Sequence, residues 1–142
     1  MKRSLNIAVI GAGLAGLTAA IHLRKEGFQV MLFEKEEYPK HKVCGEYLSN
    51  EMLPYWKHLG INPFKWGAVA IDQLELSAVN GKSLNIKLPL GGFGISRFKL
   101  DHHLLEYALS LGCTLISQTV RDIYFAENTF SISTKEHQDF EA

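Results

Sequence analysis

The sequence predicts an α/β fold, a parallel sheet with inserted antiparallel hairpins, and the prediction rests first on the N-terminal segment. Leu5–Ile10 is a short apolar run of β-type residues, long enough for a buried strand. Apolar residues then recur at three- and four-residue spacings over 14–26, which is typical of a helix that ends at Gly27. A second apolar run covers Phe28–Phe33. A strand, a helix and a strand in such a short stretch imply a right-handed crossover and a parallel strand pair.

Capping residues predict two further helices. Ser49 is expected to cap a short helix, which tolerates Pro54 only near its first turn. Asp101 is expected to cap a longer helix that ends at Gly112. Residues 114–116 follow as a short strand that is expected to join the parallel sheet.

Two antiparallel hairpins are predicted from alternating polarity on both sides of a turn. Asn80-Gly81 is the pair most typical of a tight hairpin turn, and Glu127-Asn128 occupies the same position in the second hairpin. The strand segments are Val69–Val79 with Ser83–Leu88, and Val120–Phe125 with Thr129–Thr134. The glycine-rich stretch 91–94 is expected to be a flexible loop.

A glycine motif occupies the turn between the first strand and the first helix. Gly11 allows the tight turn, Gly13 lets backbone approach a pyrophosphate, and Gly16 lets the helix pack on the strand. The helix N-terminus attracts phosphate groups. Glu34 ends the second strand, where a carboxylate accepts hydrogen bonds from ribose hydroxyls and repels a 2′-phosphate. The sequence therefore predicts a Rossmann-like dinucleotide site formed by Gly11, Ala12, Gly13, Leu14, Ala15, Gly16 and Glu34.

Composition argues against several classes of function. Fifteen basic and fifteen acidic residues give a net charge of zero, so nucleic acid is not an expected partner. No apolar run is long enough to span a membrane, and the chain is expected to be cytoplasmic, with its two cysteines reduced. His102 and His103 are adjacent on a predicted helix and are not expected to share one ligand face, so no metal site is expected.

The longer N-terminal pattern resembles FAD-dependent oxidoreductases of the superfamily that contains 4-hydroxybenzoate hydroxylase, the geranylgeranyl reductases and the flavin-dependent halogenases. The opening motif of that superfamily, GxGxxGxxxAxxLxxxGxxVxxxE, is matched at Gly11, Gly13, Gly16, Ala20, Leu23, Gly27, Val30 and Glu34. Lys35 stands where the family often has a basic residue. The resemblance implies that the cofactor is FAD and that Lys35 contributes to its site.

Two later segments extend the resemblance. Residues 42–49 are similar to the CGE-x-LS stretch of the geranylgeranyl-reductase-like branch, which implies that Cys44, Gly45 and Glu46 lie close to the flavin. Ile95-Ser96-Arg97, followed by Asp101 and Gly112, resembles a further family motif whose arginine contacts FAD. By the same resemblance, Arg97 contacts the cofactor and the backbone at Val120 lies near the adenine. No catalytic residue is assigned.

The resemblance implies an oxidoreductase that acts on an apolar organic substrate and takes electrons from a donor such as NAD(P)H. It leaves hydroxylation, double-bond reduction and halogenation open. Two alternatives also stay open: an NAD-dependent dehydrogenase fragment, and a non-catalytic nucleotide-binding module.

Family members are much longer than 142 residues, and their second FAD motif, a Gly-Asp pair, does not occur in this sequence. Residues 1–142 are therefore expected to form an N-terminal FAD-binding domain, apparently truncated, with 69–90 as the start of a substrate-facing sheet. An incomplete sheet of this kind is expected to self-associate.

Overall fold

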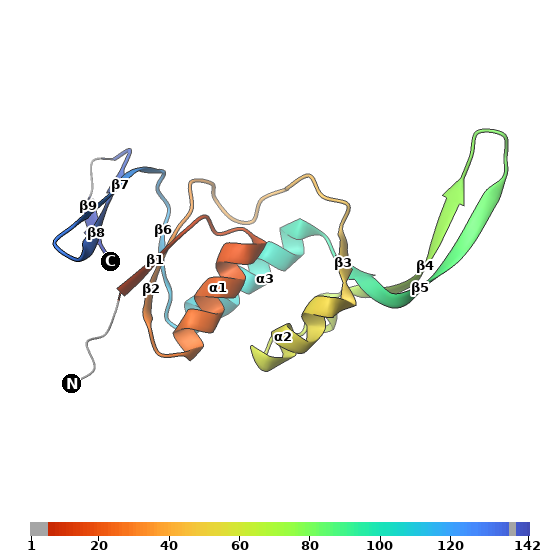
Figure 1. Ribbon diagram of the computed structural model, residues 1–142, viewed down its shortest axis with the longest axis horizontal. Coiled ribbons are helices and arrows are strands. Elements are labelled where there is room, and N and C mark those ends of the chain that lie inside the picture. The colour runs from red at the N-terminus through yellow and green to blue at the C-terminus, as the bar shows by residue number, and fades with distance from the viewer. Residues whose placement is uncertain (1–5, 137–138) are drawn as a thin grey trace. The chain divides into compact units, whose positions relative to one another are not determined.

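A computed structural model describes residues 6–136 and 139–142 of the chain, and it has the predicted α/β architecture (Figure 1). The chain divides into two compact units. The first unit joins the segment up to Lys40 with Asp101–Ala142, and the second is His41–Leu100. Each described helix is too short or too polar to cross a bilayer.

A parallel sheet lies at the centre of the first unit. Its strands are β1 (Asn6–Ile10), β2 (Gln29–Phe33) and β6 (Thr114–Ile116), in the order β1-β2-β6. The helix α1 (Leu14–Lys25) connects β1 to β2. All four elements were predicted from the apolar pattern, and both strand pairs are parallel as expected.

Two helices supply apolar side chains to the core of the first unit. Their buried residues include Leu17, Ala20 and Ile21 of α1, and Leu104, Leu105 and Ala108 of α3 (Arg97–Ser110). Arg24 links the C-terminal ends of both helices. Its Nε donates to the carbonyl oxygen of Leu111 at 2.9 Å, and its Nη1 donates to the carbonyl oxygen of Phe28 at 2.7 Å. The first unit is thus held by apolar packing and by the hydrogen bonds of the Arg24 guanidinium group.

The prediction that Asp101 caps the second long helix is wrong. The helix α3 begins at Arg97, one turn earlier, and Asp101 is buried within it at 1% exposure. The hydroxyl of Ser96 accepts a hydrogen bond from the backbone N–H of Lys99 at 3.4 Å and so takes the capping position. Serine and aspartate are both common N-caps, so residue type alone does not distinguish Ser96 from Asp101.

An antiparallel sheet completes the first unit. Its strands are β7 (Val120–Ala126), β8 (Thr129–Thr134) and β9 (Asp139–Glu141). Glu127 and Asn128 have φ angles of 51° and 64°, which is the left-handed pair of a two-residue hairpin turn, as predicted. The strand β9 was not predicted. It pairs with β8, and the ring of Phe140 packs edge-on against Phe33 at 5.2 Å.

The second unit is built on a sheet in the order β3-β5-β4, and Figure 1 shows β4 and β5 as a long two-stranded arm. The strands are β3 (Tyr47–Ser49), β4 (Val69–Ser77) and β5 (Ser83–Gly94). The hairpin around Gly81 is confirmed. The N–H of Gly81 donates to the carbonyl oxygen of Ala78 at 2.9 Å. Because Ala78 also pairs with Lys82, the loop is one residue longer than the two-residue loop of the tightest hairpins.

The glycine-rich stretch 91–94 is the end of β5, so the prediction of a flexible loop is wrong. Gly92 pairs with Ser49 on one side and with Ile71 on the other. A Cβ at Gly92 would collide with the ring of Tyr47 and with the carbonyl oxygen of Leu48. Glycine is needed here for close packing between strands, and the same lack of a side chain made the segment look like a loop.

Short helices cover the second unit. They are η1 (Asn50–Met52), α2 (Leu53–His58) and η2 (Pro63–Trp66). Ser49 caps the first of these through the N–H of Glu51, and Pro54 lies in the first turn of α2, as predicted. The core forms where Trp56, 1% exposed, packs on Phe93 with ring centroids 6.1 Å apart.

Candidate functional site

The turn from β1 to α1 has the geometry that the glycine motif requires. Gly11 has a φ angle of 96°, a conformation that other residues rarely adopt. Its N–H donates to the carbonyl oxygen of Phe33 at 2.8 Å, which fixes the turn against the end of β2. A Cβ at Gly16 would collide with the carbonyl oxygen of Gly11, so only glycine lets α1 pass this close to the turn. Gly13 has φ −75° and ψ −175°, an extended conformation open to any residue.

The N-terminus of α1 is suited to an anion. Among the described residues, none caps this end with a side chain, and the first turn of α1 contains no acidic residue. The helix dipole and the first backbone N–H groups therefore favour negative charge beside Gly13, Leu14 and Ala15. This arrangement can hold a phosphate or pyrophosphate group.

Glu34 lies at the end of β2, 7% exposed, and its carboxylate contacts the glycine turn. Its Oε2 accepts a hydrogen bond from the N–H of Ala12 at 2.9 Å, and its Oε1 accepts one from the N–H of Glu36 at 3.0 Å. Burial raises the pKa of Glu34, but hydrogen bonds from Lys40, Glu36 and Ala12 outweigh it, so the pKa lies below its ordinary value. The carboxylate is therefore charged at neutral pH.

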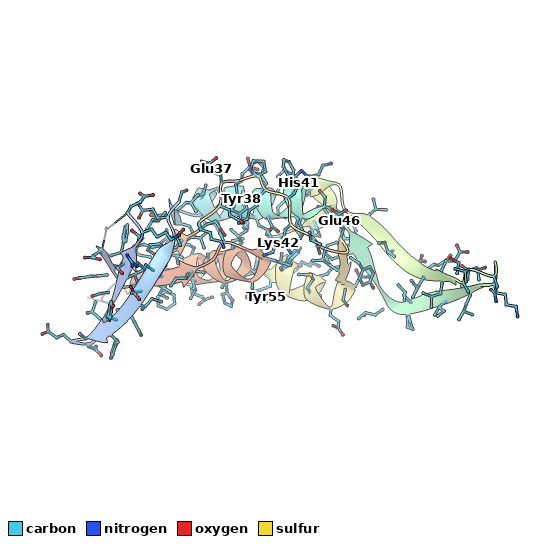
Figure 2. The ribbon with its side chains drawn as sticks, turned by 90° about the horizontal axis from the view of Figure 1, so that it is seen from above. Glu37, Tyr38, His41, Lys42, Glu46 and Tyr55 are labelled. Carbon is cyan, nitrogen blue, oxygen red and sulfur yellow. The ribbon has the colours of Figure 1, made fainter. Side chains whose placement is uncertain are left out.

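Lys40 and Tyr38 complete this cluster, and no sequence pattern predicted a site role for either. The Nζ of Lys40 lies 2.9 Å from Oε1 of Glu34 and 3.0 Å from Oε2 of Glu36, and it lies 4.8 Å from the ring centroid of Tyr38. The hydroxyl of Tyr38 donates to the carbonyl oxygen of Ala12. Figure 2 shows Tyr38 on the connection that follows β2. Lys35, the basic residue that the resemblance selected, is exposed.

In the second unit, the two later segments that carry the family resemblance, 42–49 and the one that begins at Ile95, lie side by side. The N–H of Ile95 donates to the carbonyl oxygen of Glu46 at 3.1 Å, and Tyr47 pairs with Gly94. Both segments line a pocket of about 460 Å³. Its lining residues are Gly45, Glu46, Gly67, Val69, Ile71, Gly94, Ile95, Ser96 and Lys99. Glu46 has a φ angle of 54°, unusual for a residue with a side chain, and Figure 2 shows it where the connection reaches β3.

The remaining predicted site residues are distributed over both units. Cys44 is exposed in the second unit. Arg97 is half-buried at the first position of α3, also in the second unit. Val120 is half-buried at the start of β7 in the first unit, where it pairs with Thr134.

The two adjacent histidines share a partner. His102 Nε2 lies 3.5 Å from Oε1 of Glu106, and His103 Nδ1 lies 3.2 Å from its Oε2, so each histidine contacts a different oxygen of one carboxylate. Both contacts form because side chains three and four positions apart lie on the same face of a helix. Within the described residues, no group of three or more His, Cys, Asp and Glu side chains is arranged to hold a metal ion.

Comparison with known proteins identifies the relatives of this chain. A family profile described as an NAD(P)-binding Rossmann-like domain matches residues 9–68. The digeranylgeranylglycerophospholipid reductase 1 of Methanosphaera stadtmanae is 34% identical over 134 residues, which are 90% of this chain and 32% of the reductase. A flavin-dependent halogenase of Armillaria mellea is 43% identical over 133 residues, which are 87% of this chain and 25% of the halogenase. The chain is similar in sequence to the geranylgeranyl reductases and to the flavin-dependent halogenases.

A solved structure of a flavin-dependent halogenase shows the same fold. The flavin-dependent halogenase CmlS superposes with a TM-score of 0.83 at 21% identity, over 99% of this chain and 28% of the halogenase. The sequence matches confirm the predicted resemblance, and the solved structure confirms the fold. The chain spans about a third or less of the length of the relatives that it matches.

Proposed function

We propose that the chain is the FAD-binding portion of a flavin-dependent oxidoreductase and that the β1–α1 turn holds the ADP half of FAD. The observation that carries the proposal is the buried, charged Glu34 beside a turn that only Gly11 and Gly16 can form. The turn supplies backbone donors for a pyrophosphate, and Glu34 supplies an acceptor for a ribose. These residues fit the cofactor that the relatives use.

Each residue of the site takes a separate role in the proposal. The backbone of residues 11–16 cradles the pyrophosphate, with Gly13 leaving room for it. Glu34 accepts from the ribose hydroxyls, and the exposed Lys35 adds positive charge nearby. Arg97 binds the cofactor from the start of α3, and the backbone of Val120 contacts the adenine. These assignments follow the relatives' motifs residue by residue.

The pocket in the second unit is the proposed site of chemistry. Gly45 and Glu46 line it, and Cys44 precedes them in the chain. FAD supplies the redox chemistry when bound, and the protein positions it. We infer an apolar organic substrate, with β4 and β5 forming the first part of a substrate-facing sheet over 69–90. An electron donor such as NAD(P)H and a cytoplasmic location complete the proposal.

NAD is a second candidate for the nucleotide, because the matching family profile is described as NAD(P)-binding. NAD carries the same ADP group, so the turn and Glu34 fit it equally well. The two candidates differ in the second unit. An NAD-binding fragment gives no role to the pocket in which the segments around Gly45 and Ile95 meet.

A competition titration separates the candidates. The purified chain is titrated with FAD, and bound FAD is challenged with NAD. We expect FAD to bind in preference, and Glu34→Ala and Arg97→Ala each to weaken it at least tenfold, the effect of losing one charge-assisted hydrogen bond. Displacement of FAD by equimolar NAD would favour the dehydrogenase alternative. Tight binding that neither substitution changes would contradict the site.

A further inference from the structure

Lys40 has no role in the proposed function, although its ammonium group contacts the residue assigned to the ribose. It is half-buried, with its side chain 14% exposed, and it belongs to the connection that follows β2. Four residues of this connection and of the strand end form the Glu34 cluster, which we define as Glu34, Glu36, Tyr38 and Lys40.

The hydrogen-bonding capacity of Glu34 is nearly filled within the protein. A carboxylate offers about four acceptor positions. Glu34 already accepts from Ala12, Glu36 and Lys40, so about one position remains. A ribose with two hydroxyl groups requires two. One of the three present donors must therefore leave Glu34 before both hydroxyls can bind.

Only Lys40 can leave without unfolding the site. The other two donors are backbone N–H groups, one in the glycine turn at Ala12 and one at Glu36 directly after the strand. Lys40 has a flexible four-carbon stem and a second partner, because Oε2 of Glu36 lies 3.0 Å from its Nζ. The side chain of Glu36 is 59% exposed and is free to follow the ammonium group outward.

We propose that Lys40 competes with the ribose diol for Glu34 and so sets how strongly this site discriminates nucleotides by their hydroxyl groups. In the bound complex the ammonium group releases Glu34 and keeps its contact with Glu36, and a ribose hydroxyl takes the vacated acceptor position. The inference rests on the proposed function, since it requires a nucleotide at Glu34. It makes Lys40 a specificity-determining residue, unassigned by any sequence motif.

The test compares two probes that differ only in the diol. Calorimetric titrations measure the Kd of ADP and of 2′,3′-dideoxy-ADP for the whole chain and its variants. The ratio of the dideoxy Kd to the ADP Kd reports the diol contacts, because the charge of the diphosphate cancels. Lys40→Met is expected to raise this ratio about tenfold, the effect of one added hydrogen bond to a carboxylate. Lys25→Met removes an exposed lysine at the other end of α1 and is expected to leave the ratio unchanged.

Glu36→Gln tests the second half of the proposal and does not depend on how Lys40→Met folds. Without a charged carboxylate at position 36, the displaced ammonium loses its alternative partner, so the ratio is expected to fall below that of the unmodified chain. A ratio that Lys40→Met leaves unchanged or lowers would overturn the role of Lys40 alone. Failure of ADP to bind any variant would overturn the proposed function, and the competition with it.

Discussion

At the residue scale, the ionisation of Glu34 makes the stability of the fold depend on pH. Its pKa is lowered in the folded chain, so the fold favours its charged form, and that stabilisation is present at neutral pH. It is lost as the pH falls through the folded pKa. Hydrogen bonds from Lys40, Glu36 and Ala12 are the cause, and the one from Lys40 is the largest of these.

Glu34→Gln is therefore expected to lower the free energy of unfolding at neutral pH and to have a smaller effect in acid. Urea unfolding of both proteins across the acidic range measures the difference. The same comparison in a Lys40→Met background is the control, because the leading hydrogen bond to Glu34 is then missing and the pH dependence should shrink. An equal loss of stability at every pH would show that Glu34 is not stabilised through its charge.

Sequence patterns identified the residues of the glycine turn and Glu34, but not the residues that contact Glu34 in space. Gly11, Gly16 and Glu34 were identified because a tight turn, a close helix and a ribose each require one residue type at one spacing. Lys40 was missed because its contact with Glu34 depends on the path of the connection after β2, which has no periodic pattern. Lys35 was preferred from the family motif, and it is exposed.

At the element scale, local pattern predicted every long helix and the strands of both hairpins. The missed strands, β3 and β9, have three residues each and are stabilised by partners elsewhere in the chain. The end of β5 was taken for a loop for the same reason, since Gly92 is strand only because Ser49 and Ile71 pair with it. Pairing between distant segments is a tertiary effect that strand propensity does not contain.

The β7–β8 turn gives an element-scale prediction. Asn128 has a φ of 64°, a conformation that asparagine tolerates and a β-branched residue does not. Asn128→Val is expected to destabilise the chain by about 1–2 kcal/mol, the cost of a left-handed residue, whereas Asn128→Gly is expected to preserve or raise stability. Chemical denaturation of the three proteins measures both changes. Equal stability of the valine variant would show that the turn adopts another conformation.

At the scale of the whole molecule, apolar surface is exposed on the arm of β4 and β5. Leu74 pairs with Ile86 and Leu76 pairs with Leu84, so the four side chains share one face. Their exposed fractions are 41%, 38%, 52% and 58%. In the part of the chain that the structure describes, the outer edge of β1 is also unpaired. Exposed apolar faces and open strand edges both favour association.

We therefore expect the 142-residue chain to associate with a second copy through the apolar face of the arm. Light scattering after size exclusion should show a mass that rises with concentration. Replacing Leu76 and Leu84 together by threonine, a residue with high strand propensity, removes apolar area without disfavouring the strands, so this variant should stay monomeric. The matched control replaces Glu75 and Asn85, the neighbouring pair on the opposite face, by the same residue, threonine, and should associate like the unmodified chain.

A chain that is monomeric at all concentrations would show that the arm is stable in water without a partner. Association that survives the Leu76 and Leu84 replacement would direct attention to the open edge of β1, because that edge binds through backbone groups that side-chain changes on the arm do not alter.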